Sequence, residues 1–248
     1  MTQKTPRSVE AFIERYITKS RLETRQATQA AAEITHPLFA PCVTFSRESG
    51  SGGSEVAVEV ARRLDFEFFD RKMTDYIANR AKVRKSVVES TDERTRANLQ
   101  ELIRDLTSQE YMSQSSYFRH LVEVISLIGE RGNAVILGRG ANFILAPEKI
   151  LRVRVFAPLE LRIERMTRRN HISHKMARSK VLSLDAEREN FIRARFFKDP
   201  ADLSGYDLAI NTEYMSVDAC ADVVLEAFFS KMTPNLLRKG KLTSKQAG

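Results

Sequence analysis

The sequence predicts an α/β fold with a parallel sheet, and three observations carry this prediction. Five short segments are apolar on both faces, as strands buried inside a parallel sheet should be. Stretches with a helical spacing of apolar residues alternate with these segments, which implies crossover connections between parallel strands. A glycine-rich loop stands between the first strand segment and the helix that follows it. Together these features favour one α/β domain with a helical insertion after its second strand.

The expected elements follow one another at regular intervals. The strand candidates are residues 42–45, 66–69, 133–137, 150–157 and 206–211. The clearest helix candidates are residues 54–64, 159–169 and 217–229, in which apolar residues return every three or four positions. Residues 71–131 are mostly helical and highly charged, with one apolar stripe made of Leu99, Leu102, Ile103 and Leu106.

Residues 1–39 look like a separate helical arm in front of a domain that spans residues 40–230. Phe12, Ile13 and Tyr16 recur at helical spacing, and the alanine-rich run 21–32 also favours a helix. The pair His36-Pro37 interrupts any helix there. Such an arm could cover an apolar patch on the main domain or on a second subunit, so a homodimer through this arm is one expectation.

Composition excludes several classes of protein. The 248 residues are 42% hydrophobic and 29% charged, which is enough for a core and argues against wholesale disorder. No stretch approaches the roughly 18–20 apolar residues of a membrane-spanning helix. The first residues lack the apolar region of a secretory signal, so we expect a cytoplasmic protein without a membrane partner.

The net charge of +8 is concentrated at one end of the chain. Residues 231–248 carry five lysines and arginines and no acid, which leaves only +3 for the body. A disordered, solvated tail and a tail that binds a polyanion are the two interpretations. A nucleic-acid partner is not favoured, because the body itself is nearly neutral.

The glycine-rich loop from Gly50 to Gly53 suits phosphate binding. Glycines let successive backbone N–H groups point at one anion, and the positive end of the following helix adds to the attraction. Ser54, in the first helical turn, could cap the helix or place its hydroxyl on magnesium. A plain tight turn is the alternative. Against the pattern G-x-x-x-x-G-K-[ST], Gly53 stands at the lysine, so Arg47 is the first candidate to supply that charge.

Six segments resemble the cytidylate kinase-like family, a branch of the P-loop nucleoside monophosphate kinases. They are SRESGSGG at 46–53, FFDR at 68–71, VILGRGANFI at 135–144, APLELRIER at 157–165, the arginine-rich segment 185–198, and YDLAINT at 206–212. They occur in the family's order over roughly residues 41–230. The resemblance implies a three-layer α/β/α P-loop fold with a five-stranded parallel sheet. It also implies a helical insertion at about 71–131 that binds the nucleoside monophosphate, and an arginine-bearing lid at about 170–203.

The resemblance further implies an activity and its residues. The activity would be transfer of the γ-phosphoryl group of ATP, with Mg²⁺, to a nucleoside monophosphate or a related phosphorylated small molecule. The implied ATP-binding residues are Ser49, Gly50, Ser51, Gly52, Gly53, Ser54 and Arg165. The implied catalytic residues are Arg47, Arg139, Arg188, Arg193 and Arg195. The implied acceptor site holds Asp70, Arg71 and Arg139, and the metal site Ser54 and Asp70.

Some of these assignments rest on criteria that disagree. Arg188 and Arg195 are two helical turns apart and share one side of a helix, whereas the family comparison favours Arg193, so all three are kept. Asp70 follows a strand at the edge where ligands of open α/β sheets bind, but it could equally cap the next helix. Arg165 could flank the donor base or be an exposed helix charge.

Three departures from authentic cytidylate kinases leave a second function open. Gly53 replaces the loop lysine of typical P-loop kinases, although the cytidylate kinase-like branch shares this glycine. Leu137 replaces an acid at the end of the third strand, and Gly140 replaces an aspartate that contacts the acceptor sugar. A non-catalytic, nucleotide-binding regulator with the same fold is therefore the alternative to a kinase.

Overall fold

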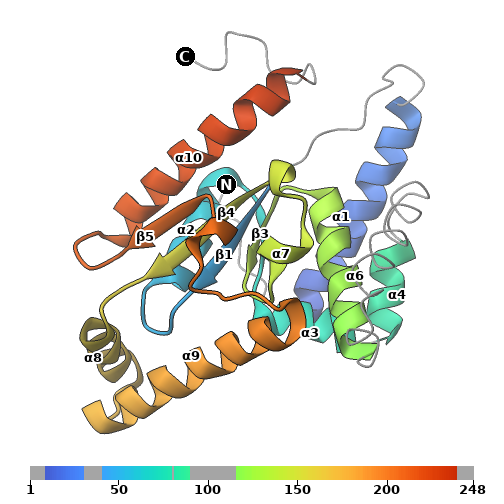
Figure 1. The fold of residues 1–248 in the computed structure, drawn as a ribbon. Coiled ribbons are helices and arrows are strands. Elements are labelled where there is room, and N and C mark those ends of the chain that lie inside the picture. Colours follow the sequence, from blue (N-terminus) through green and yellow to red (C-terminus); the bar gives the residue numbers. More distant parts are fainter. Residues whose placement is uncertain (1–8, 31–40, 80, 90–115, 239–248) are drawn as a thin grey trace. The chain divides into compact units, whose positions relative to one another are not determined.

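The computed structural model describes residues 9–30, 41–79, 81–89 and 116–238. The chain divides into two units, one made of residues 1–38 and 71–131 and the other of residues 39–70 and 132–248 (Figure 1). The second unit carries the whole sheet and the glycine-rich loop, so the candidate site is built there. The predicted apolar stripe at 99–106 lies outside the described residues.

A five-stranded, all-parallel sheet forms the centre of the second unit. Its strands are β1 (Cys42–Arg47), β2 (Glu67–Phe69), β3 (Ala134–Leu137), β4 (Ile150–Phe156) and β5 (Leu208–Asn211). They lie in the order β2-β3-β1-β4-β5. In register, Cys42 of β1 pairs with Ala134 on one side and with Ile150 on the other. The predicted α/β fold with five parallel strands is therefore confirmed, and all five strands were placed to within two residues at each end.

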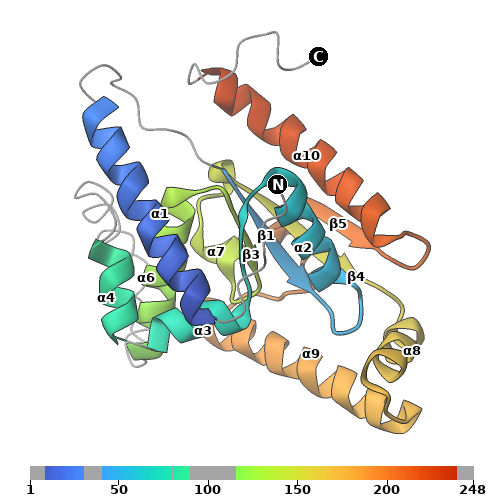
Figure 2. The same ribbon diagram turned by 180° about the vertical axis from the view of Figure 1, so that it is seen from behind.

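Two helices, α2 (Gly53–Leu64) and α10 (Val217–Arg238), lie side by side over one face of this sheet (Figures 1 and 2). Alternate residues of the strands point toward them, because side chains in a strand alternate between the two faces. Val56 and Val60 of α2 and Val224 of α10 are fully buried against Val43 and Val153. This apolar layer fixes the start of α2, and with it the glycine-rich loop, to the sheet.

The remaining elements of this unit are shorter, except for one long helix. They are α7 (Ala141–Ile144), η1 (Pro147–Lys149), α8 (Leu159–Asn170), α9 (His174–Phe196) and η2 (Leu203–Gly205). The Ser173 hydroxyl accepts a hydrogen bond from the Met176 amide and caps the start of α9. α8 and α9 pack together around Ile163, Ala177 and Val181, which are fully buried.

The other unit contains four described helices. They are α1 (Val9–Ala30), α3 (Arg71–Asn79), α4 (Ala81–Glu89) and α6 (Ser116–Arg131). Arg131 donates a 3.0 Å hydrogen bond to the Tyr16 carbonyl, and its guanidinium lies 4.0 Å from the centre of the Tyr16 ring. The helix expected from the spacing of Phe12, Ile13 and Tyr16 is present, and these three side chains are buried. The helical character predicted for 71–131 is seen in α3, α4 and α6.

The carboxyl-terminal helix extends further than the sequence pattern suggested. We expected it to end at Phe229, with a disordered basic tail from Lys231, but α10 continues to Arg238. Met232 is fully buried, and the Lys231 ammonium lies 2.5 Å from an Asp207 carboxylate oxygen. Lys231 therefore belongs to the folded unit, and only residues 239–248 of the predicted tail lie outside the described residues. None of the described helices is long and apolar enough to cross a membrane.

Candidate functional site

The glycine-rich loop connects the end of β1 with the first turn of α2. Gly50 and Gly52 both adopt a positive φ, of 80° and 82°, which glycine reaches without strain. A Cβ atom on Gly50 would lie only 2.5 Å from the carbonyl oxygen of Arg162, so this residue must be glycine for α8 to approach the loop. The loop curls around the start of α2, where the first N–H groups of a helix have no intrahelical partner.

Hydrogen bonds within the loop hold this shape. The Ser51 hydroxyl, which is fully buried, donates to the carbonyl oxygen of Glu48 over 2.9 Å and accepts from the Gly53 amide over 3.4 Å. The amide of Ser51 also donates to the Glu48 carbonyl, at 3.4 Å. Ser51 is therefore a structural residue of the loop, with its side chain turned inward.

A second set of bonds joins the loop to β5 and α8. Arg165 donates to the carbonyl oxygen of Ser51 (3.2 Å), to the Thr212 hydroxyl (2.9 Å) and to the Thr212 carbonyl (2.8 Å). The Thr212 hydroxyl itself donates to the Ser51 carbonyl over 2.6 Å. We expected Arg165 to flank a donor base or to be an exposed helix charge. In the structure it joins α8 to the loop and to the residue after β5, and it also lines the cavity described below.

A buried arginine, Arg162, holds the first half of the loop. Its side chain is only 10% exposed and donates to the carbonyl oxygens of Ala157 (2.9 Å) and Ser49 (3.3 Å). It forms ion pairs with two carboxylates, those of Glu48 (3.2 Å) and Asp185. Because an unpaired charge in such a position would be costly, the two carboxylates are required for Arg162 to be buried.

The long helix α9 brings Arg188 onto the loop. Its guanidinium donates to the Ser49 hydroxyl over 2.9 Å and to the carbonyl oxygen of Arg47 over 3.3 Å. One turn earlier in α9, the Asp185 carboxylate accepts a 2.7 Å hydrogen bond from the Ser49 amide. The predicted lid arginine Arg188 and the predicted loop residue Ser49 are thus in direct contact.

The other two lid candidates are placed differently. Arg193 is exposed and pairs with Glu189 (2.7 Å) and Asp199 (3.2 Å). The hydrogen bond to Glu189 and the charge of Asp199 raise the pKa of Arg193. Arg195 is half-buried, and neither Arg193 nor Arg195 lines the cavity. The structure therefore brings Arg188, and not Arg193, to the glycine-rich loop.

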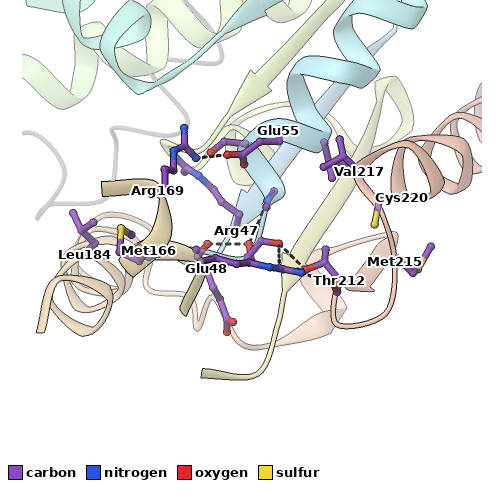
Figure 3. A pocket seen from close by; sticks show the side chains of 18 of the residues that line it. Arg47, Glu48, Glu55, Met166, Arg169, Leu184, Thr212, Met215, Val217 and Cys220 are labelled. Carbon is purple, nitrogen blue, oxygen red and sulfur yellow. Dashed lines mark hydrogen bonds and ion pairs between the residues drawn. The ribbon is translucent and has the colours of Figure 1, made fainter. Parts of the chain in front are cut away.

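A cavity of about 460 Å³ opens beside the loop (Figure 3). Figure 3 shows apolar side chains on opposite sides of Arg47 and Glu48, with Met166 and Leu184 on one side and Met215, Val217 and Cys220 on the other. The polar lining includes the loop from Ser49 to Ser54 and four guanidinium groups, those of Arg47, Arg165, Arg169 and Arg188. Its volume lies within the range of about 300–1,000 Å³ that is usual for small-molecule sites.

The turn after β3 lies at the same edge of the sheet, next to β1. Gly138 and Gly140 have φ values of 84° and 70°, and Arg139 between them has a φ of 55°. A Cβ on Gly138 would lie 2.5 Å from a guanidinium nitrogen of Arg47, so Arg47 extends toward this turn. The guanidinium of Arg139 lies 4.9 Å from the centre of the Phe191 ring on α9. Two predicted catalytic arginines therefore belong to this region, Arg139 in the turn itself and Arg47 with its guanidinium next to Gly138.

Phe196 packs against the turn after β3 at Gly140. Its ring occupies the space that a side chain on Gly140 would need, and its centre lies 5.5 Å from that of Phe143. The same helix, α9, thus contacts the phosphate loop through Arg188 and the β3 turn through Phe191 and Phe196.

The two predicted metal-site residues are not brought together. Ser54 lines the cavity, whereas Asp70 follows β2, which is two strands away from β1, and does not line it. Arg71, the predicted acceptor ligand next to Asp70, belongs to the other unit and lies 3.6 Å from Asp75 in an ion pair within α3.

The cavity fits a polyphosphate with its magnesium ion. The start of α2, the turned loop backbone and the guanidinium groups all favour an anion, and the apolar walls suit a base. Among the described residues, no group of three or more His, Cys, Asp or Glu side chains could hold a metal by itself. Mg²⁺ commonly keeps several waters and binds substrate phosphates together with one or two protein oxygens. Ser54 lines the cavity, and its hydroxyl is the predicted oxygen for such an ion.

Comparison with known proteins assigns the family. The model of the cytidylate kinase-like family matches residues 42–214. The chain belongs to the cytidylate kinase-like family. The predicted resemblance is therefore confirmed, and the matched segment includes the loop, the β3 turn, α8, α9 and Thr212.

Individual relatives match more narrowly. A cytidylate kinase from Sulfolobus acidocaldarius is 31% identical over 105 residues, which cover 42% of this chain and 57% of that protein. A cytidylate kinase from Methanocaldococcus jannaschii is 33% identical over 103 residues, or 40% and 58% of the two chains. The matches thus span little more than half of these relatives. A crystal structure of an uncharacterized protein from Eubacterium ventriosum is similar over 77% of this chain and 98% of its own, with a TM-score of 0.61 and 20% identity, and shows the same fold.

Four residues of the site were not singled out from the sequence. Arg162 and Thr212 lie inside the family segments, but an arginine on a helix and a threonine after a strand have many possible roles. Asp185 belongs to the arginine-rich segment 185–198, in which the positive charges are the evident candidates for binding phosphate. Phe196 could not be recognised because its contact with Gly140 depends on the path of α9.

Proposed function

We propose that this protein transfers the γ-phosphoryl group of ATP, in the presence of Mg²⁺, to a nucleoside monophosphate or a related phosphorylated small molecule. The observation that carries the proposal is the contact of Arg188 with the phosphate loop, at the wall of a cavity of about 460 Å³. Membership of the cytidylate kinase-like family supports it.

The chain's own residues would align the phosphates and balance their charge. Backbone N–H groups from Gly50 to Ser54 would hold the donor phosphates, and Mg²⁺, with the Ser54 hydroxyl among its ligands, would neutralise charge on them. Phosphoryl transfer needs such positioning and positive charge more than covalent help. Arg188 would supply charge from the lid side, since its planar guanidinium can hold two phosphate oxygens at once.

Arg47 and Arg139 would serve the acceptor side. Arg139 lies in the turn after β3, and Arg47, at the end of the neighbouring strand β1, extends toward Gly138 of that turn. Arg139 would hold the acceptor's phosphate, and Arg47, which reaches from the end of β1 toward that turn, would lie between the two phosphate groups. In this arrangement Arg47 and Arg188 together take the place of the lysine that Gly53 replaces.

The test is ADP formation from MgATP with a panel of nucleoside monophosphates and phosphorylated sugars, measured beside ATP binding by calorimetry. A kinase shows acceptor-dependent ADP formation that EDTA abolishes, and Arg139→Ala raises KM for the acceptor. ATP binding with no acceptor-dependent turnover would instead support the nucleotide-binding regulator.

A further inference from the structure

We propose that Asp185 is a positioning residue of this site, which fastens α9 to the phosphate loop through the Ser49 amide and keeps Arg188 directed at the loop. The inference rests on the proposed function for its kinetic consequence, although the fastening itself does not depend on it. Three polar contacts surround the Asp185 carboxylate.

Both oxygens of the Asp185 carboxylate are used. One accepts the Ser49 amide at 2.7 Å and faces the Arg188 guanidinium at 3.4 Å. The other accepts from Arg162, whose side chain is 10% exposed. The carboxylate therefore joins three segments that are distant in sequence: the loop, α8 and α9.

A carboxylate beside a phosphate-binding loop would ordinarily repel the ligand. Here two guanidinium groups, those of Arg162 and Arg188, lie beside it and offset its charge. Ser49 also precedes Gly50, where the proposed cradle of N–H groups begins. Asp185 thus occupies the Ser49 amide, at the edge of the cradle. Within the cradle, the amides of Ser51 and Gly53 make long 3.4 Å hydrogen bonds to loop atoms.

The position of Arg188 follows from this fastening. Arg188 is one helical turn after Asp185, so the two side chains lie on the same face of α9. With α9 tied at Ser49, the Arg188 guanidinium reaches the Ser49 hydroxyl and the Arg47 carbonyl. Without the tie, a long side chain that is only partly buried would sample many rotamers, and a misplacement of about 1 Å can cost about 100-fold in rate.

Hydrogen exchange of the Ser49 amide, followed by NMR in the full-length protein, tests the fastening without any turnover. We expect the amide to be protected in the wild type and in Asp185→Asn, which keeps an acceptor oxygen, and to lose protection in Asp185→Ala. The amide of Val224 in α10 reports whether each variant is folded. A Ser49 amide that exchanges freely in the wild type, or one that stays protected in a folded Asp185→Ala, would overturn the proposal.

Kinetics test the second part through a double-mutant cycle. Asp185→Ala removes the tie that directs Arg188, and we expect kcat to fall by about 10–100-fold with a smaller change in KM for ATP. In an Arg188→Ala background the same substitution should change kcat by less than about twofold, because the two residues act as one unit. Glu189→Gln, an exposed neighbour on α9, is the matched control and should leave kcat unchanged.

The outcomes separate the two proposals. An equal loss of kcat from Asp185→Ala in both backgrounds would show a merely structural role and refute the positioning role. A wild type that shows no acceptor-dependent ADP formation would refute the kinase while the amide exchange still decides whether Asp185 fastens α9.

Discussion

The Thr212 hydroxyl donates a 2.6 Å hydrogen bond to the carbonyl oxygen of Ser51, and this bond ties the end of β5 to the middle of the phosphate loop. Both residues are buried, and Arg165 donates to both. Thr212 therefore couples the last strand of the sheet to the shape of the proposed phosphate cradle.

Replacing Thr212 with valine should destabilise the protein and loosen the loop. The substitution keeps the shape but removes one acceptor of the part-buried Arg165 guanidinium and the hydroxyl donor to the Ser51 carbonyl, at a cost of about 1–3 kcal/mol. We expect a lower urea midpoint and weaker ATP binding. Thr212→Ser keeps the hydroxyl and should preserve both, so equal losses in the two variants would contradict this role.

Gly53 should not tolerate the lysine that typical P-loop kinases carry. A Cβ there would lie 2.7 Å from the Cβ of Arg47 and 2.9 Å from that of the buried Val155, and neither atom can move without its backbone. We expect Gly53→Lys to lower stability by about 1–3 kcal/mol, as overpacking does, and to reduce turnover. Val58→Lys, at an exposed position of the same helix, is the control. A stable, faster Gly53→Lys enzyme would show that the packing argument is wrong.

Arg188 and Arg193 should differ sharply in their effect on catalysis. Arg188→Ala removes the guanidinium that contacts the loop, and we expect kcat to fall by about 10²–10³, the scale for loss of one charge-stabilising donor. Arg193→Ala removes only exposed ion pairs, which contribute about 0–1 kcal/mol, and should leave kcat nearly unchanged. Steady-state ADP formation measures both, and the reverse ranking would assign the lid role to Arg193.

Asp207 should make stability depend on pH in the acid range. Burial alone would raise its pKa, but hydrogen bonds from Arg152 and Lys231 outweigh burial and lower the pKa below its ordinary value. A lowered pKa in the folded state stabilises the protein above about pH 4, and this contribution is lost as pH falls through the folded-state pKa.

Urea unfolding at several pH values between 3 and 7 follows this contribution. The stability difference between the wild type and Asp207→Asn should be largest near pH 7 and shrink below about pH 4. Asp222→Asn, at an exposed carboxylate, should show little difference at any pH. A difference between the wild type and Asp207→Asn that stays constant down to pH 3 would count against the ionised carboxylate as its source.

Much of the sheet could be read from the sequence because buried parallel strands are apolar on both faces and end at recognisable loops. The glycine-rich loop was predictable for the same reason, since a positive φ at Gly50 and Gly52 calls for glycine. The end of α10 could not be predicted in this way. Lys231 looks like a solvent-exposed residue in the sequence, and its ion pair with Asp207 is visible only in the fold. A local sequence pattern indicates which secondary structure and burial a residue favours, whereas an ion pair depends on segments that come together only in the fold.

In the candidate site, too, the residue types could be predicted from the sequence but the contacts between distant segments could not. Helical spacing grouped Arg188 with Arg195, and the family resemblance pointed to Arg193, but neither criterion shows where the helix rests. The contacts of Asp185 with Ser49 and of Phe196 with Gly140 fix the position of α9, and both join residues more than fifty positions apart.

The helix α9 contacts the glycine-rich loop through Arg188 and the turn after β3 through Phe196, and this pair of contacts has a thermodynamic consequence. Residues 188 and 196 are separated by two turns of continuous helix, or about 12 Å, and so short a rod does not bend easily. A displacement of the helix at the phosphate loop is therefore also felt at the turn after β3. A substrate that stabilises the contact of α9 at its own end therefore also stabilises the contact at the other end. Such a linkage is reciprocal, so each substrate raises the affinity for the other by the same factor.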